Sequence, residues 1–138
     1  MDDLQYQQDI DAVEIYLIEE HEINVIFGDD EENAYWKPNG HACVSINTNQ
    51  RKRLQLYTIL HEAGHVIVRA KERYNKLYPY GQNEKSKTIS RRIDVLREEV
   101  AAWDEGERLA AKSQSKDIPV PPYDSPILVS KISLCPAR

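Results

Sequence analysis

Residues 61–65 read His-Glu-Ala-Gly-His, and this motif constrains the fold more than any other feature of the chain. Positions i and i+4 lie one turn apart on the same face of an α-helix. On a helix, His61 and His65 can therefore both reach one Zn²⁺ ion. Glu62 is then placed to act as a general base on water that the metal activates. The chain must supply a helix here and a second element that completes the metal site.

The sequence around the motif favours that helix. The run over residues 50–74 contains no proline, and Gly64 is its single glycine. Asparagine and threonine, which often precede the first turn of a helix, occupy residues 47–49. Apolar or small residues recur at steps of three and four, at Leu54, Tyr57, Leu60, Gly64 and Val68. The spacing predicts a helix from about residue 50 to residue 74.

A catalytic zinc site usually has three protein ligands and leaves a fourth position for water, so a third ligand is needed. A second long helix is predicted over residues 89–112, and it carries adjacent carboxylates at Glu98 and Glu99. Glu99 shares a helical face with Leu96, Trp103, Gly106 and Ala110, and Glu98 shares one with Val95, Ala101, Ala102 and Leu109. This periodicity does not separate the two glutamates. We predict Glu99 as the third ligand, with Glu98 as the alternative.

The remaining histidines and the cysteines are weaker candidates. His21 lies near the end of the first predicted helix, where we expect a surface position. His41 begins a predicted strand ahead of the motif, and we expect it to face the substrate rather than bind metal. Cys43 and Cys135 lie far apart and form no CxxC pair, so we expect neither to bind zinc.

The rest of the chain predicts an α+β fold. An apolar stripe predicts an N-terminal helix over residues 4–20. Apolar runs at residues 22–27, 34–36 and 41–46 are separated by tight turns. Such short, closely connected strands favour a small three-stranded, mainly antiparallel sheet.

The composition changes after the second long helix. Five of the seven prolines follow Ser113, and they exclude a regular helix there. We therefore predict one domain over residues 1–112, which contains the expected metal site, and an extended tail over residues 113–138. Three arrangements are open for this tail: a strap packed on the surface, a segment that lies over the cleft and restrains activity, or disorder.

The charge balance and the hydropathy disfavour nucleic acids and membranes as partners of this protein. The 138 residues carry a formal net charge of −5, which disfavours nucleic-acid binding by bulk electrostatics. We find no signal-peptide pattern and no apolar run long enough to cross a bilayer. We therefore expect a soluble, cytoplasmic protein whose partner is a protein or peptide substrate.

The chain resembles the gluzincin metallopeptidases, in particular small minimal members and the ImmA/IrrE-type family of bacteria and their phages. The similar stretch covers residues 23–110 and includes the motif and the acidic, alanine-containing helix after it. This resemblance implies a zincin-like fold in which His61 and His65 bind Zn²⁺ and Glu62 is the catalytic base. Gluzincins place an Asp four residues after the third ligand, but this chain has Trp103 there, with Asp104 as the nearest substitute.

These observations predict a zinc-dependent peptidase. The alternative is a catalytically silent or partner-activated zincin-fold module that binds or regulates another protein. We expect an extended substrate to lie along residues 41–46 by strand addition. A side chain outside the ligand set is expected to stabilise the oxyanion, and the candidates are His41, Tyr35, Tyr57, Tyr74, Tyr78 and Tyr80.

Overall fold

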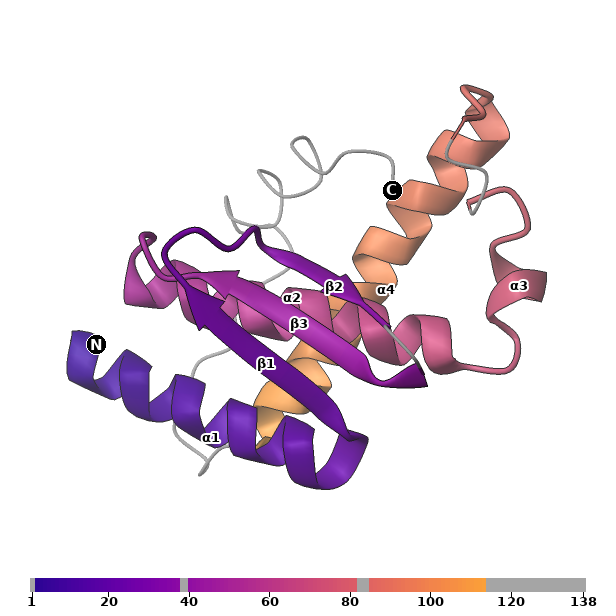
Figure 1. The fold of residues 1–138 in the computed structure, drawn as a ribbon. Helices are drawn as coiled ribbons and strands as arrows, with labels where there is room; N and C mark the ends of the chain where they lie inside the picture. The colour runs from indigo at the N-terminus through magenta and orange to yellow at the C-terminus, as the bar shows by residue number, and fades with distance from the viewer. Residues whose placement is uncertain (1, 38–39, 82–84, 114–138) are drawn as a thin grey trace.

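The computed structural model describes residues 2–37, 40–81 and 85–113. The predicted tail, apart from Ser113, lies outside these residues. The fold is α+β, with three helices of 19 residues or more around a small sheet (Figure 1). The elements in order are α1 (Asp3–His21), β1 (Ile23–Gly28), β2 (Ala34–Trp36), β3 (Ala42–Asn47), α2 (Lys52–Ala70), α3 (Tyr74–Leu77) and α4 (Ile89–Ser113).

The sheet is mixed, so the prediction of a mainly antiparallel sheet is wrong for one of its two pairings. The strand order is β1-β3-β2, with β3 parallel to β1 and antiparallel to β2. The chain reverses twice between β1 and β3, and β2 takes the far side of β3, so β1 and β3 become parallel neighbours. The connection from β1 to β2 is fastened to the end of β3, since the Asn47 amide donates to Asn33 Oδ1 at 2.8 Å.

The central position of β3 also corrects the expected substrate strand. Residues 42–46 are all buried, and β3 has a paired neighbour on each edge. A strand whose two edges are both paired has no backbone groups left for a further strand. Strand addition along residues 41–46 is therefore excluded, and β1 and β2 are the edge strands of the described sheet.

Helix α1 forms as its apolar stripe predicts. The Asp2 side chain accepts a hydrogen bond from the Gln5 amide at 2.9 Å and caps the first turn. Ile10, Val13 and Leu17 are fully buried, so this stripe packs into the core as predicted. The helix ends at His21, and the left-handed backbone of Glu22 after it (φ 55°) turns the chain into β1.

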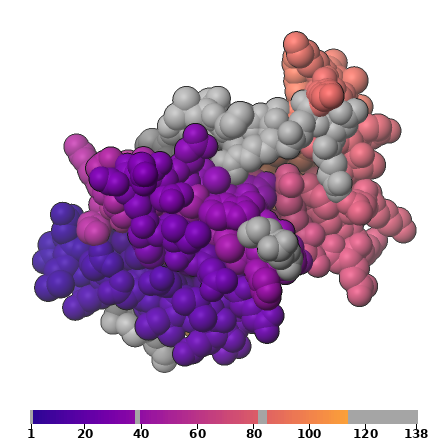
Figure 2. Space-filling model, viewed as in Figure 1, coloured from indigo at the N-terminus to yellow at the C-terminus, as the bar shows by residue number. Residues whose placement is uncertain are grey.

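Helix α2 carries the motif through the middle of the molecule. Figure 1 shows the sheet on one side of α2 and shows α4 crossing α2 on the other side. In the same view, Figure 2 shows the sheet and α1 at the surface in front of α2. Every residue from 55 to 65 is buried, so α2 is enclosed on all sides rather than amphipathic. The helix ends at Ala70, earlier than predicted, and Tyr74–Leu77 forms the separate short helix α3.

Two glycines let α2 and α4 approach at the level of the backbone. A Cβ atom on Gly64 would lie 2.8 Å from the carbonyl carbon of Ala102 and closer still to its oxygen. A Cβ on Gly106 would lie 3.0 Å from the carbonyl oxygen of Leu60. Because Gly64 lies between the two motif histidines, the closest approach of the helices falls at the motif itself.

Helix α4 begins at the predicted residue and ends one residue later than predicted, but it has a different inward face. Ile93, Leu96 and Val100 follow one another at helical spacing, which predicts an apolar face turned inward, yet they are 51%, 47% and 42% exposed. Glu98 and Glu99 are buried instead. The reason is that α4 packs here against a histidine pair rather than an aliphatic surface. Within the described residues, no helix has the length and apolarity to cross a membrane.

Candidate metal centre

Three of the predicted ligands meet where α2 and α4 cross. His61 Nε2 lies 2.6 Å from Glu99 Oε2, and His65 Nε2 lies 3.1 Å from Glu99 Oε1. The three donor atoms all lie within 4.8 Å of one another. The side chains are 1%, 3% and 3% exposed, respectively, for His61, His65 and Glu99. They form a buried group on two helices that could hold a metal ion.

The chemistry and spacing of this group fit a small divalent cation. Two imidazole nitrogens and one carboxylate oxygen form a donor set that zinc accepts. Ligands bonded at about 2.0–2.1 Å to a tetrahedral Zn²⁺ are separated by about 3.3 Å. The observed contacts of 2.6 and 3.1 Å differ from that separation by less than one ångström. The polar partner of the buried His65 Nε2 is the Glu99 carboxylate at 3.1 Å, and a cation between the two atoms would be bound by both of them.

Glu98 also lies at the centre, but it faces the other ring nitrogen. Its Oε2 atom is 2.5 Å from His65 Nδ1, on the side of the ring away from Glu99. Arg69 Nε donates to the same carboxylate at 3.1 Å, and the Tyr74 hydroxyl donates to it as well. A carboxylate on the second nitrogen of a histidine ligand fixes its tautomer and raises its basicity. The two glutamates that the sequence left unresolved thus occupy different places.

The charges of the group are strongly coupled. Burial alone would lower the pKa of His65, but hydrogen bonds and negative charge from Glu98 and Glu99 outweigh it and raise the pKa to about 9. Burial would raise the pKa of Glu98, but His65, Tyr74 and Arg69 outweigh burial and lower it to about 2. The two histidines likewise hold the pKa of Glu99 far below its usual range. Without a metal the group is therefore an ion-pair network.

Aromatic rings hold both imidazoles in place. Tyr35 of β2 stacks on His65, with ring centroids 4.7 Å apart and planes 7° apart. Trp103 stacks on His61, with centroids 5.1 Å and planes 26° apart. Trp103 occupies the place of the expected supporting Asp, so this chain supports His61 by ring contact. Asp104 is partly buried and is not in the donor group.

Glu62 is fully buried beside the donor group, with Oε1 3.7 Å from His61 Nδ1. Of the other predicted residues, Tyr35 stacks on His65 and Tyr74 donates to Glu98, and the rest are outside the donor group. His21 and His41 are exposed, and Cys43 is a buried thiol in β3. Cys135 lies outside the described residues. Tyr57 contacts Arg53, and Tyr78 contacts Arg97.

Sequence reasoning missed Arg69. It lies four residues after His65 and therefore on the same face of α2, which is the signal that could have identified it. Its guanidinium lies over the rings of Tyr35 and Tyr74, 5.1 and 5.6 Å from their centroids. Arg69 thus links the centre to the outer end of α2.

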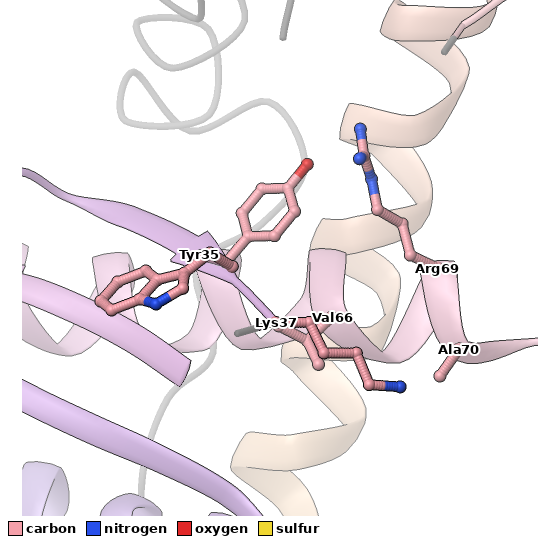
Figure 3. Close-up of a pocket in the computed structure, with 6 residues that line it drawn as sticks. Tyr35, Lys37, Val66, Arg69 and Ala70 are labelled. Atoms are coloured by element: carbon pink, nitrogen blue, oxygen red, sulfur yellow. The ribbon is translucent and has the colours of Figure 1, made fainter. Parts of the chain in front are cut away.

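A pocket of about 200 Å³ lies beside the centre. Figure 3 shows Tyr35 and Arg69 on either side of it, with Lys37 and Val66 between them. Its lining comes from β2 with the residue after it, and from the last turns of α2: Tyr35, Trp36, Lys37, Val66, Arg69 and Ala70.

No family model, curated protein or solved structure matches this chain. The fold and the site define the chain as an α+β protein with a buried His-His-Glu group on two crossing helices. This group is compatible with a zincin-like site.

Proposed function

We propose that this protein is a zinc-dependent metallopeptidase. The observation that carries the proposal is the convergence of His61, His65 and Glu99 beside the buried Glu62. Among the described residues the donor group has three members. Structural zinc sites usually have four protein ligands, whereas catalytic sites have three and keep a position for water. The donor number therefore favours catalysis.

His61, His65 and Glu99 would hold the ion, which when bound supplies a Lewis acid and lowers the pKa of water to about 7. Glu62 accepts the proton of the attacking water and passes it to the leaving amine. Glu98 keeps His65 in the tautomer that presents Nε2 to the donor group. Burial of the group strengthens each of these electrostatic interactions.

Strand β2 is the part of the sheet best placed to receive a peptide. In the described residues it pairs with β3 alone, so its outer edge can accept an extended segment. Its residue Tyr35 lies against His65, which places that edge next to the donor group.

A binding or regulatory module with a non-catalytic metal is the second candidate. The observation that favours it is burial, because Glu62 and the three donors are at most 3% exposed. In that case Glu62 has no chemical task. A substitution that keeps its shape but removes its basicity distinguishes the two functions.

The test measures zinc content and peptide cleavage on the same preparations. Elemental analysis should give about one zinc per chain in the wild type and in Glu62→Gln, and little in His65→Ala or Glu99→Ala. A mixed peptide library should be cleaved by the wild type and not by Glu62→Gln. Equal activity of Glu62→Gln and the wild type would contradict the role of Glu62. Zinc without cleavage would favour the binding module, and no zinc after reconstitution would exclude both.

A further inference from the structure

Two cationic side chains, Lys37 and Arg69, line the pocket beside the metal centre. Among the described residues, the lining has no other ionisable side chain apart from the Tyr35 phenol, and it has no carboxylate. Arg69 forms an ion pair with Glu98 at 3.1 Å, so Lys37 is the cation of the lining whose charge is not offset. This local charge is notable in a chain whose net charge is −5. Trp36, Val66 and Ala70 supply apolar surface between the two cations.

Both cations have donors to spare. Arg69 uses Nε for Glu98, and its two terminal nitrogens form no hydrogen bond within the described residues. Lys37 is exposed and, in the same part of the chain, forms no ion pair. A guanidinium fork and an ammonium group together can bind one carboxylate by charge-assisted hydrogen bonds.

We propose that this pocket binds a carboxylate of the peptide substrate and so determines which peptides the protein selects. The inference rests on the proposed peptidase function. The volume of about 200 Å³ is below the range of drug-sized ligands and suits a single amino-acid side chain. A carboxylate on a short apolar stem matches the lining, because the stem can pack on Trp36 and Val66 while the charge pairs with a cation. Figure 3 draws the Lys37 and Arg69 head groups toward different ends of the pocket, and the exposed, flexible Lys37 side chain can turn toward a carboxylate held by the terminal nitrogens of Arg69.

The pocket is close enough to the centre to fix the register of a bound peptide. The Tyr35 ring lines the pocket and also stacks on His65. Arg69 is linked to His65 through Glu98. A carboxylate held in the pocket is thus one side chain away from the donor group. The carboxylate has two possible sources, an acidic side chain or the C-terminus of the peptide.

The test measures peptide binding to the Glu62→Gln variant. Under the proposed function this variant does not cleave the peptide, so binding can be measured on the intact ligand. Trp36 lines the pocket and provides a fluorescence signal. Acetylated, amidated alanine peptides with one central Glu are compared with the same peptides carrying Gln. A third set has Gln at the centre and a free C-terminus, which separates the two sources. All sets are measured with zinc and again with EDTA, because a carboxylate can also bind zinc directly.

A carboxylate peptide should bind on the order of tenfold more tightly than its neutral counterpart, with zinc and with EDTA. The added variant Lys37→Glu should abolish this preference, and Lys37→Gln should reduce it. The control Lys112→Glu makes the same charge change at the exposed end of α4 and should retain the preference.

Three results would overturn the inference: no preference in Glu62→Gln, a preference that survives Lys37→Glu, or a preference that disappears with EDTA. Cleavage by the zinc-loaded wild type is scored separately. Cleavage without a carboxylate preference refutes the pocket and leaves the peptidase. A Lys37-dependent preference without any cleavage supports the pocket and refutes the peptidase.

Discussion

The closest contact between α2 and α4 should decide whether the donor group can form. The Gly64→Ala substitution would place a Cβ atom 2.8 Å from the carbonyl carbon of Ala102, where ordinary contacts are 3.4–4 Å. The helices must therefore separate by about 0.6 Å or more, since backbone cannot rotate out of the way as a side chain can. A metal site tolerates distance errors of about 0.2 Å. The shift is several times larger and separates Glu99 from both histidines.

Two opposing terms set the effect of Gly64→Ala on stability. Alanine in a helix interior gains about 1 kcal/mol over glycine. Overpacking of a rigid core costs about 1–3 kcal/mol, and a clash with backbone lies at the upper end. We expect a net loss of about 1–2 kcal/mol and a fall in zinc affinity of at least tenfold. Urea unfolding with EDTA measures the first quantity, and calorimetric zinc titration measures the second.

Gly106→Ala is the matched control for this prediction. It makes the same chemical change on the facing helix, but its nearest contact is 3.0 Å from the oxygen of Leu60, which requires a movement of only a few tenths of an ångström. The gain in helix propensity should roughly offset that strain. If Gly64→Ala is as stable as Gly106→Ala and binds zinc like the wild type, the close approach of the helices does not set the site.

Three further predictions concern the ligands and their charges. Glu98→Ala should still bind one zinc at saturation, but about 10–100-fold more weakly, because His65 loses the partner of its Nδ1 atom. Complete loss of zinc binding in a calorimetric titration would instead make Glu98 a ligand. Metal uptake at pH 7 should release about one proton, because the metal-free His65 has a pKa of about 9 and its Nε2 atom must lose a proton to bind the metal. The zinc affinity should therefore rise with pH up to about 9. Calorimetry in two buffers of different ionisation enthalpy measures this release, and identical heats would contradict it. Zinc at about 1,000 times its Kd should stabilise the wild type by about 4 kcal/mol over the EDTA-treated protein in thermal unfolding, and Glu99→Gln should show no such difference.

Local pattern alone determined helices α1 and α4 and the motif geometry, whereas it did not predict that α2 ends at Ala70 or that α3 is separate. The stripe of α1, the bounds of α4 and the helical setting of residues 61–65 follow from spacing within one element. For the same reason His61 and His65 had to lie on one face of α2. Such features require no knowledge of distant residues, because backbone periodicity fixes them.

The tertiary structure decided everything that depends on how the elements meet. Adjacent residues on a helix differ by about 100° in direction, so Glu98 and Glu99 could both face inward, and only the crossing at Gly64 separated them. The same crossing left Ile93 and Val100 exposed, although their spacing predicted a core face. The strand order was likewise open, because short strands can pair in several ways and the packing of the whole sheet selects one. The sequence determined which groups are present along each element, and tertiary packing determined which atom each group faces.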